Sequence, residues 1–179
     1  MRLKEKDDMI DQAGIMMAQG LGTASERIQG VNDNMSQSHY HEYFEIYYLE
    51  AGERFHMVED QLYHMEQGEF MIFPPYVMHH SYGEKNVPFK RLVLYFTPEE
   101  VLWPSILTEL KEEIGVYQVD IRERQEIHRL MEILLKEQNN PGLHHDEFNQ
   151  GIINVLLLLI LRQKHPERAS ENSSRIGEV

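Results

Sequence analysis

The stretch that decides the fold is His39-Tyr40-His41-Glu42-Tyr43-Phe44-Glu45-Ile46-Tyr47-Tyr48-Leu49-Glu50-Ala51-Gly52. Its aromatic and β-branched residues suit a half-buried strand, and Ala51-Gly52 is expected to end that strand. Successive side chains of a strand point to opposite faces, so positions 39, 41, 43 and 45 are expected on one face. Two imidazoles and a carboxylate, those of His39, His41 and Glu45, are therefore predicted to project together.

Short segments of the same character continue to about residue 97. We expect further strands at residues 54–58, 62–65, 69–73, 77–82 and 90–96. Gly68 precedes the third of these segments and Pro74-Pro75 ends it. Short strands at close spacing, separated by turn residues, are typical of an antiparallel sandwich or barrel. Residues 1–38 show only weak patterning, which predicts a mobile or edge-lying arm with at most a short helix.

A second spaced pattern, Gly68-x5-Pro74-x4-His79, supplies a fourth candidate ligand. If the barrel closes, His79 on a neighbouring strand completes a site of three imidazoles and one carboxylate. Such nitrogen and oxygen donors suit Zn, Ni, Fe, Mn or Co. The same residues would also be explained by a polar interior that hydrogen-bonds within itself or to an organic ligand, because buried polar groups need partners.

Three other histidines of this region are candidate ligands. His56 and His64 lie in the predicted hairpin and are expected to be solvated, although either could face the interior. His80 follows His79 on a strand and is therefore expected to face the opposite side.

The pattern changes from strand to helix after Thr97-Pro98. We expect helices from Pro98 to about residue 114, from Asp120 onward, and over about 146–164. Trp103 on the first helix is expected to pack against the barrel. Residues 152–161 are apolar almost all round, interrupted only by Asn154. This predicts a helix buried on most sides, by its own domain or by a second copy.

Composition narrows the class of protein. The 179 residues include 17 Lys+Arg and 30 Asp+Glu, a formal net charge of −13. This acid excess argues against direct binding of this chain to nucleic acid or to an anionic membrane. The absence of cysteine excludes disulfides, thiolate ligands and cysteine nucleophiles. A charged N-terminus, with no apolar run of about 20 residues, predicts a cytoplasmic protein.

The spacing His39-x-His41-x3-Glu45-x6-Gly52 resembles the first cupin motif, and Gly68-x5-Pro74-x4-His79 resembles the second. The match departs from those motifs at Tyr76, which usually is Gly, at Gly83, which often is Asn, and in lacking a Gly upstream of His39. The resemblance implies a mainly β chain with C-terminal α structure. It would be a cupin-type antiparallel β-barrel (a double-stranded β-helix or jelly roll) followed by about three helices. It also implies one divalent transition metal (Zn, Ni, Fe or Mn) at His39, His41, Glu45 and His79.

The surrounding sequence, over about residues 30–165, is similar to the N-terminal effector domain of AraC-type transcription regulators. The similarity lies in residues 41–52 and in Gly68-Glu69-Phe70-Met71-Ile72-Phe73-Pro74-Pro75 followed by His79. It implies a small-molecule effector, such as a sugar, and a homodimer formed by the C-terminal helices. DNA would be bound only through a helix-turn-helix domain that is missing from this chain. The expected effector-binding residues are Tyr43, Tyr47, His41, Glu45 and His79.

The expected organisation is an N-terminal arm at 1–29, a barrel at 30–97, a helical dimerisation region at 98–165 and a linker at 166–179 toward the missing domain. The sequence is compatible with two functions. One is an effector-sensing and dimerisation domain without enzyme activity, and the other is a metal-dependent cupin dioxygenase, isomerase or decarboxylase. The long helical C-terminus favours the sensor. The enzyme would also need a general acid or base, for which Tyr43 is the best candidate.

Overall fold

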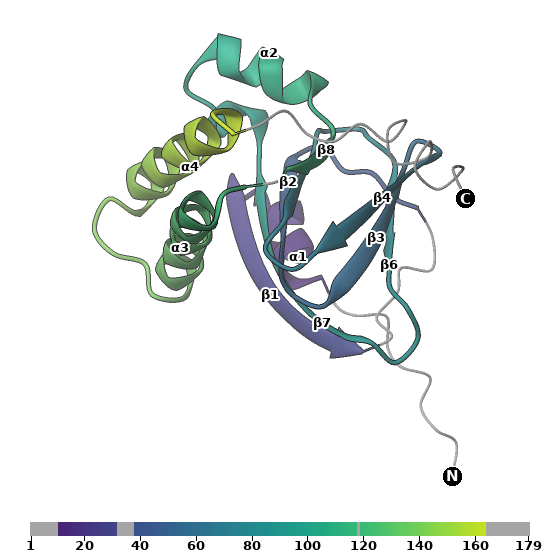
Figure 1. Ribbon diagram of the computed structural model, residues 1–179. Helices are drawn as coiled ribbons and strands as arrows, with labels where there is room; N and C mark the ends of the chain where they lie inside the picture. The colour runs from purple at the N-terminus through teal and green to yellow at the C-terminus, as the bar shows by residue number, and fades with distance from the viewer. Residues whose placement is uncertain (1–10, 32–37, 118, 164–179) are drawn as a thin grey trace.

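The computed structural model describes residues 11–31, 38–117 and 119–163, which form a β-sandwich with helices on one side (Figure 1). The elements in chain order are α1 (Gln12–Ala18), β1 (Thr23–Val31), β2 (Phe44–Ala51), β3 (Glu53–Val58), β4 (Gln61–Glu66), β5 (Phe70–Phe73), β6 (His79–Tyr82), β7 (Pro88–Phe96), the 3-10 turn η1 (Pro98–Glu100), α2 (Pro104–Glu112), β8 (Gly115–Tyr117), α3 (Ile121–Asn139) and α4 (His145–Leu161).

The strands form two antiparallel sheets that face each other. The larger sheet has the order β1-β7-β2-β5-β8 and the smaller has the order β4-β3-β6. This arrangement confirms the prediction of a cupin-type β fold followed by helices. The predicted hairpin is also present, because β3 pairs with β4 from Glu53↔Glu66 to Val58↔Gln61.

The larger sheet is buried on both faces. On β2, Phe44, Ile46 and Tyr48 belong to the core that the sheet shares with the helices. Tyr47 and Leu49 instead belong to the core between the two sheets. This explains why the deciding stretch is apolar at successive positions, because a strand covered on both faces does not alternate between apolar and polar residues.

The helices α3 and α4 cover the outer face of the larger sheet (Figure 1). One stripe of α4 is fully buried there, formed by Ile153, Leu156, Leu157 and Ile160. Val155, on another side of α4, is 49% exposed. The predicted second and third helices are thus confirmed, and the Asp120 side chain caps the second by accepting a hydrogen bond from the Arg122 N–H at 3.1 Å.

Asn154 interrupts the apolar run of α4 because its side chain has three backbone partners. Its Oδ1 accepts from the Leu102 N–H at 2.9 Å. Its Nδ2 donates to the carbonyl of Glu100 and to that of Gln150, each at 2.8 Å. The amide therefore fastens the segment between η1 and α2 to the middle of α4.

The structure corrects the predicted N-terminal arm. Residues 23–31 form β1, which pairs with β7 from Thr23↔Phe96 to Val31↔Pro88, so the predicted boundary between arm and barrel at 29/30 falls inside a strand. The short helix α1 precedes it and buries Ala13 and Met17 in the core between the sheets. Hydrophobic periodicity does not reveal β1 because it is an edge strand that carries Glu26 and Arg27.

The structure also corrects the first predicted helix. It is divided into η1 and α2, because Pro104 lacks the N–H that a continuous helix would need there. Gly115 opens β8, which pairs with β5, instead of ending a helix. Trp103 precedes α2 and is 43% exposed, so the prediction that it packs against the barrel was wrong.

The predicted linker at 166–179 and residues 1–10 of the predicted arm lie outside the described residues. Within the described residues, no helix combines the length and the apolar character that crossing a membrane requires.

Candidate functional site

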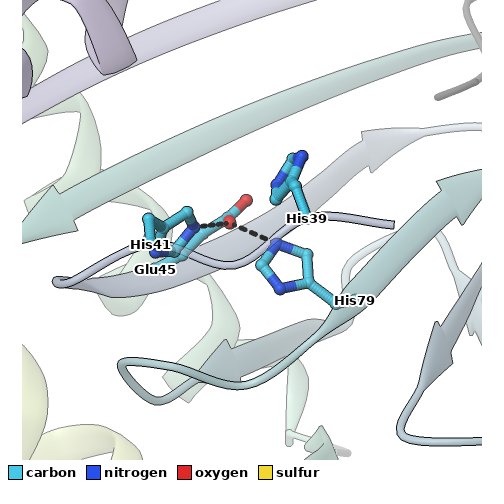
Figure 2. Close-up of side chains that lie close together, drawn as sticks. All are labelled: His39, His41, Glu45 and His79. Atoms are coloured by element: carbon cyan, nitrogen blue, oxygen red, sulfur yellow. Dashed lines mark hydrogen bonds and ion pairs between the residues drawn. The ribbon is translucent and has the colours of Figure 1, made fainter. Parts of the chain in front are cut away.

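The four predicted metal ligands lie together at one end of the barrel (Figure 2). Each can offer one ligand atom such that all four atoms lie within 4.8 Å of one another. His39 is exposed, His41 is half-buried, and Glu45 and His79 are buried. The residues predicted to share one face thus do converge, but β2 begins only at Phe44, so His39 and His41 lie in the segment that leads into it.

Backbone pairing brings the two spaced patterns together. The His39 N–H donates to the His79 carbonyl at 3.0 Å, and the His79 N–H donates to the His39 carbonyl at 2.9 Å. The Tyr76 N–H also donates to the His41 carbonyl at 2.9 Å. These three bonds fix the segment before β2 against the segment before β6.

Hydrogen bonds to the backbone set the tautomers of two imidazoles. His41 Nδ1 lies 2.8 Å from the Tyr43 carbonyl oxygen, and His79 Nδ1 lies 3.0 Å from that of Val77. A carbonyl oxygen only accepts, so each Nδ1 carries a hydrogen and donates it. Both Nε2 atoms then face the same oxygen of Glu45, at 3.0 Å from His41 and 3.2 Å from His79. This contact is favourable only with a proton or a metal cation on the imidazole side.

The charges of the group are coupled. Burial by itself would raise the pKa of Glu45, but hydrogen bonds from His41 and His79 and their positive charge hold it well below its usual range. Burial would likewise lower the pKa of His79, yet the hydrogen bond and the negative charge of Glu45 raise it. The pKa of His39 is lowered to about 4 by the partial burial of its ring and by the nearby charge of His79. His39 is therefore neutral at pH 7.

The donor set fits a divalent transition metal. Three imidazole nitrogens and one carboxylate oxygen are ligands that Zn, Ni, Fe and Mn accept. Metal-bound histidines commonly donate their other ring N–H to a carbonyl, which orients the ring. His41 and His79 already make that bond, to Tyr43 and Val77.

A cavity of about 880 Å³ opens beside this group. Its wall includes His41 and Tyr43, whose rings stack in parallel with centroids 4.3 Å apart. The remaining lining comes from α1 (Gly14, Met17 and Ala18), from Glu42, from residues 74–77 and 97–99, and from Lys111. The volume is in the range of small-molecule sites.

The other predicted effector residues lie behind this cavity. Glu45 and His79 adjoin His41. Tyr47 lies deeper, is 2% exposed and meets the His56 ring edge-on at 4.5 Å. Of the five predicted effector residues, the structure thus places two on the cavity wall and three in the interior beside or below it.

Two polar residues of β3, Arg54 and His56, lie in the interior although the sequence did not predict it. His56 was expected to be solvated but is completely buried, and burial is the main cause that lowers its pKa to about 3. Arg54 on the same strand is 3% exposed. The alternation Arg54-x-His56-x-Val58 was the available signal, since it places all three on one face. His64 is half-exposed and pairs with Glu53 at 3.1 Å, and His80 lies outside the core as predicted.

Tyr76, a departure from the second motif, stands at the cavity mouth. Its φ is 65°, in the left-handed region that favours glycine. The side chain is 64% exposed, lines the cavity and lies 6.2 Å from the ring of Tyr40. The structure thus explains why Gly is usual there and shows what this chain gains, an aromatic ring at the entrance.

A second group of potential ligands lies between the larger sheet and α3, and an arginine already neutralises it. Glu50 on β2 binds His128 of α3 at 2.7 Å and Arg27 of β1 at 2.7 Å. Arg27 also pairs with Glu132 of α3. The group therefore ties α3 to the outer face of the barrel.

The fold and site define a cupin-type ligand-binding domain, and comparison with known proteins gives its family. The family model for the AraC-like ligand binding domain matches residues 27–175, so the chain belongs to that family. No curated protein sequence matches the chain.

One solved structure agrees on the fold. The AraC-like transcriptional activator CuxR is similar with a TM-score of 0.55 and 9% identity, over 80% of this chain and 51% of CuxR. This chain thus spans about half the length of CuxR. A cupin protein from Bacteroides fragilis has a TM-score of 0.40 and 15% identity, over 43% of this chain and 67% of that protein. A variant of oxalate decarboxylase from Bacillus subtilis has a TM-score of 0.39 and 16% identity, over 48% of this chain and 24% of the decarboxylase.

Proposed function

We propose that this chain is the effector-sensing and dimerisation domain of an AraC-type transcriptional regulator, and that a small metabolite, such as a sugar, binds in its barrel. The observation that carries the proposal is the cavity of about 880 Å³ beside the stacked rings of His41 and Tyr43, in a domain of a ligand-binding family. We further propose that the protein acts in the cytoplasm, as the sequence predicts.

The response to the effector would pass through β2. Its inward side chains, Glu45 and Tyr47, adjoin the binding site, while its outward Tyr48 and Glu50 contact His128 of α3. An effector that binds two arrangements of barrel and helices with different affinity shifts the balance between them. DNA binding would then follow through a helix-turn-helix domain, to which the predicted linker at 166–179 would lead.

Pairing of two copies would use α4. Val155 is 49% exposed, and Ile152, Leu158 and Leu159 are partly exposed on a helix with one buried stripe. Light scattering tests this directly: the protein is expected to be a dimer, and Val155→Asp a monomer. Ile121→Asp, at an apolar site 62% exposed on α3, is the matched control and should remain dimeric. A monomeric wild-type protein contradicts the proposal.

We also propose that the histidine group holds one divalent transition metal, with His39, His41, Glu45 and His79 as ligands. The donor set supports a metal-dependent cupin enzyme as the second candidate function. Its general acid or base would be Tyr43, but burial and the charges of Asp11 and Glu45 raise the pKa of that phenol to about 12. A base is most effective with a pKa near the working pH, so the sensor is favoured.

A thermal-shift screen of the 179-residue protein against a metabolite library tests the sensor. An effector that binds only the folded state raises the melting temperature. The shift should disappear in Tyr43→Ala, which opens the cavity wall, and persist in Tyr82→Ala, outside it. The sensor is contradicted if no metabolite stabilises the protein. It is also contradicted if the protein alone converts the stabilising metabolite into a product, as an enzyme would.

A further inference from the structure

A polar patch lies deep between the two sheets, below the histidine group. Arg54 and His56 reach it from β3, Ser81 from β6 and Arg91 from β7. Arg54 donates to Ser81 Oγ at 3.2 Å and stacks its guanidinium on the Phe89 ring at 4.1 Å. The guanidinium carbon of Arg91 lies 5.4 Å from the centroid of the Tyr47 ring. Two permanent cations thus lie inside the barrel of a chain whose net charge is −13.

Arg91 is the cation without an anion. It alternates on β7 with Phe89, Val93 and Tyr95, which all belong to the core between the sheets, so its side chain points inward. Within the part of the chain that the structure describes, no hydrogen bond or ion pair involves its guanidinium. The interior Glu45 is already held by His41 and His79. Arg91 is half-buried and faces the interior, where a compensating anion stabilises a guanidinium, so the site is incomplete.

His56 supplies the second unsatisfied group. It is completely buried, and neither of its ring nitrogens has a hydrogen-bond partner among the described residues. Its ring is neutral and can donate one hydrogen bond and accept another. It lies edge-on to Tyr47, the ring that also faces Arg91. Buried polar groups without partners, gathered around one aromatic ring, indicate a ligand that completes them.

We propose that the effector is a small organic carboxylate with an apolar body, and that its carboxylate binds Arg91 while His56 contributes a hydrogen bond. This inference rests on the proposed effector-sensing function and narrows its ligand class. The planar guanidinium matches a carboxylate with two parallel hydrogen bonds. Apolar surface beside the patch comes from Phe73, whose ring centroid lies 5.4 Å from that of His56, and from Val93, two residues after Arg91 on the same face of β7. A phosphate monoester would bring nearly twice the negative charge toward Glu45, which disfavours it.

Benzoate and benzamide form the matched pair of probes, because they share a shape and differ in charge. Each is titrated into the 179-residue protein at constant ionic strength, with EDTA present so that no metal binds the carboxylate. Benzoate is expected to raise the melting temperature in a saturable way, and benzamide is not. Arg91→Gln should weaken benzoate binding by about ten- to one-hundredfold. Lys90→Gln, on the other face of β7, should leave it unchanged.

Three results overturn the inference: equal binding of benzamide and benzoate, an unchanged benzoate response in Arg91→Gln, and a larger response to inorganic phosphate. If Arg91→Gln does not fold, Arg91→Lys replaces it. Lysine keeps the positive charge but cannot form the two parallel hydrogen bonds of a guanidinium. An undiminished benzoate response in Arg91→Lys therefore also contradicts the assignment. A neutral metabolite that binds in the screen while benzoate does not overturns the carboxylate assignment and leaves the sensor intact. If neither benzoate nor any metabolite of the screen binds, the carboxylate assignment and the sensor function are both contradicted.

Discussion

His39 and His79 exchange both of their backbone hydrogen bonds, at 3.0 and 2.9 Å, although 40 positions separate them in the sequence. This bridge lies outside the longer strands and joins the two motifs at one end of the barrel. It places the ring of His39 edge-on to that of His79, with centroids 4.5 Å apart. The rings are therefore positioned by main-chain bonds, so that a side chain can be replaced without removing the bridge.

The first prediction concerns the metal. Protein purified without added metal is expected to carry nearly stoichiometric divalent transition metal by elemental analysis, and His41→Ala to lose most of it. Acid should release the metal, because protons compete for the same imidazole nitrogens. His64→Ala, which removes a half-exposed histidine outside the group, is the control. Substoichiometric metal that does not change in His41→Ala would contradict metal binding and the enzyme alternative together.

The second prediction concerns acid stability. Burial would raise the pKa of Glu50, but hydrogen bonds from Arg27 and His128 lower it below its ordinary value of 4.5. Because the folded-state pKa is depressed, this stabilisation is complete above about pH 4.5 and is lost as the pH falls through the folded-state pKa. Glu50→Gln should cost about 1–3 kcal/mol at pH 7 and less in acid.

Urea unfolding of both proteins between pH 7 and pH 3 measures this difference. The curves of wild-type protein and Glu50→Gln are expected to converge as the pH falls. Glu59→Gln, on the exposed turn between β3 and β4, is the control and should change little. A difference that stays constant across the pH range would show that Glu50 stabilises the fold by packing alone.

The third prediction concerns Tyr76. Tyr76→Gly should raise the free energy of unfolding by about 1 kcal/mol, because glycine adopts the left-handed conformation without the clash of a Cβ atom. The same change should weaken effector binding, because it removes a ring from the cavity mouth. Asn86→Gly is the control at φ 64°, and it should gain less since asparagine tolerates this region. Denaturant unfolding measures the first effect and calorimetry the second; a loss of stability in Tyr76→Gly would contradict the explanation.

The fourth prediction concerns Asn154. Asn154→Leu should destabilise the protein by about 2–4 kcal/mol, because the Leu102 N–H and the Glu100 carbonyl lose their partner. Gln150→Leu is a matched control on the same helix, since Gln150 reaches that carbonyl only at 3.5 Å. Urea unfolding compares the variants. Equal losses in the two variants would show that the clamp made by Asn154 contributes nothing specific.

The sequence allowed the fold class and the histidine group to be predicted, because motif spacing fixes which residues approach the bridge between His39 and His79. It did not allow β1 to be predicted, since an edge strand with Glu26 and Arg27 has no apolar period and is held by pairing with β7. It also gave no reason to place Arg91 inside. A charged residue in a strand usually faces solvent, and only the registration of β7 between β1 and β2 shows otherwise.

The same limit applies to the helices. The apolar run of α4 predicted burial, but the division between its buried stripe and the exposed Val155 depends on the angle at which α4 meets the sheet. Likewise, the two prolines near the start of the first predicted helix were compatible with one helix or two. The contact of Asn154 with residues 100 and 102 is formed only in the folded chain.

The most direct test of the central claim is calorimetric titration of the stabilising metabolite from the screen into wild-type protein and Tyr43→Ala. Effector sensing in the barrel predicts saturable binding at one site per chain in the wild-type protein, and a large loss of affinity in the variant. Unchanged affinity in Tyr43→Ala, with the variant folded as judged by its melting curve, would place the ligand elsewhere and contradict the claim.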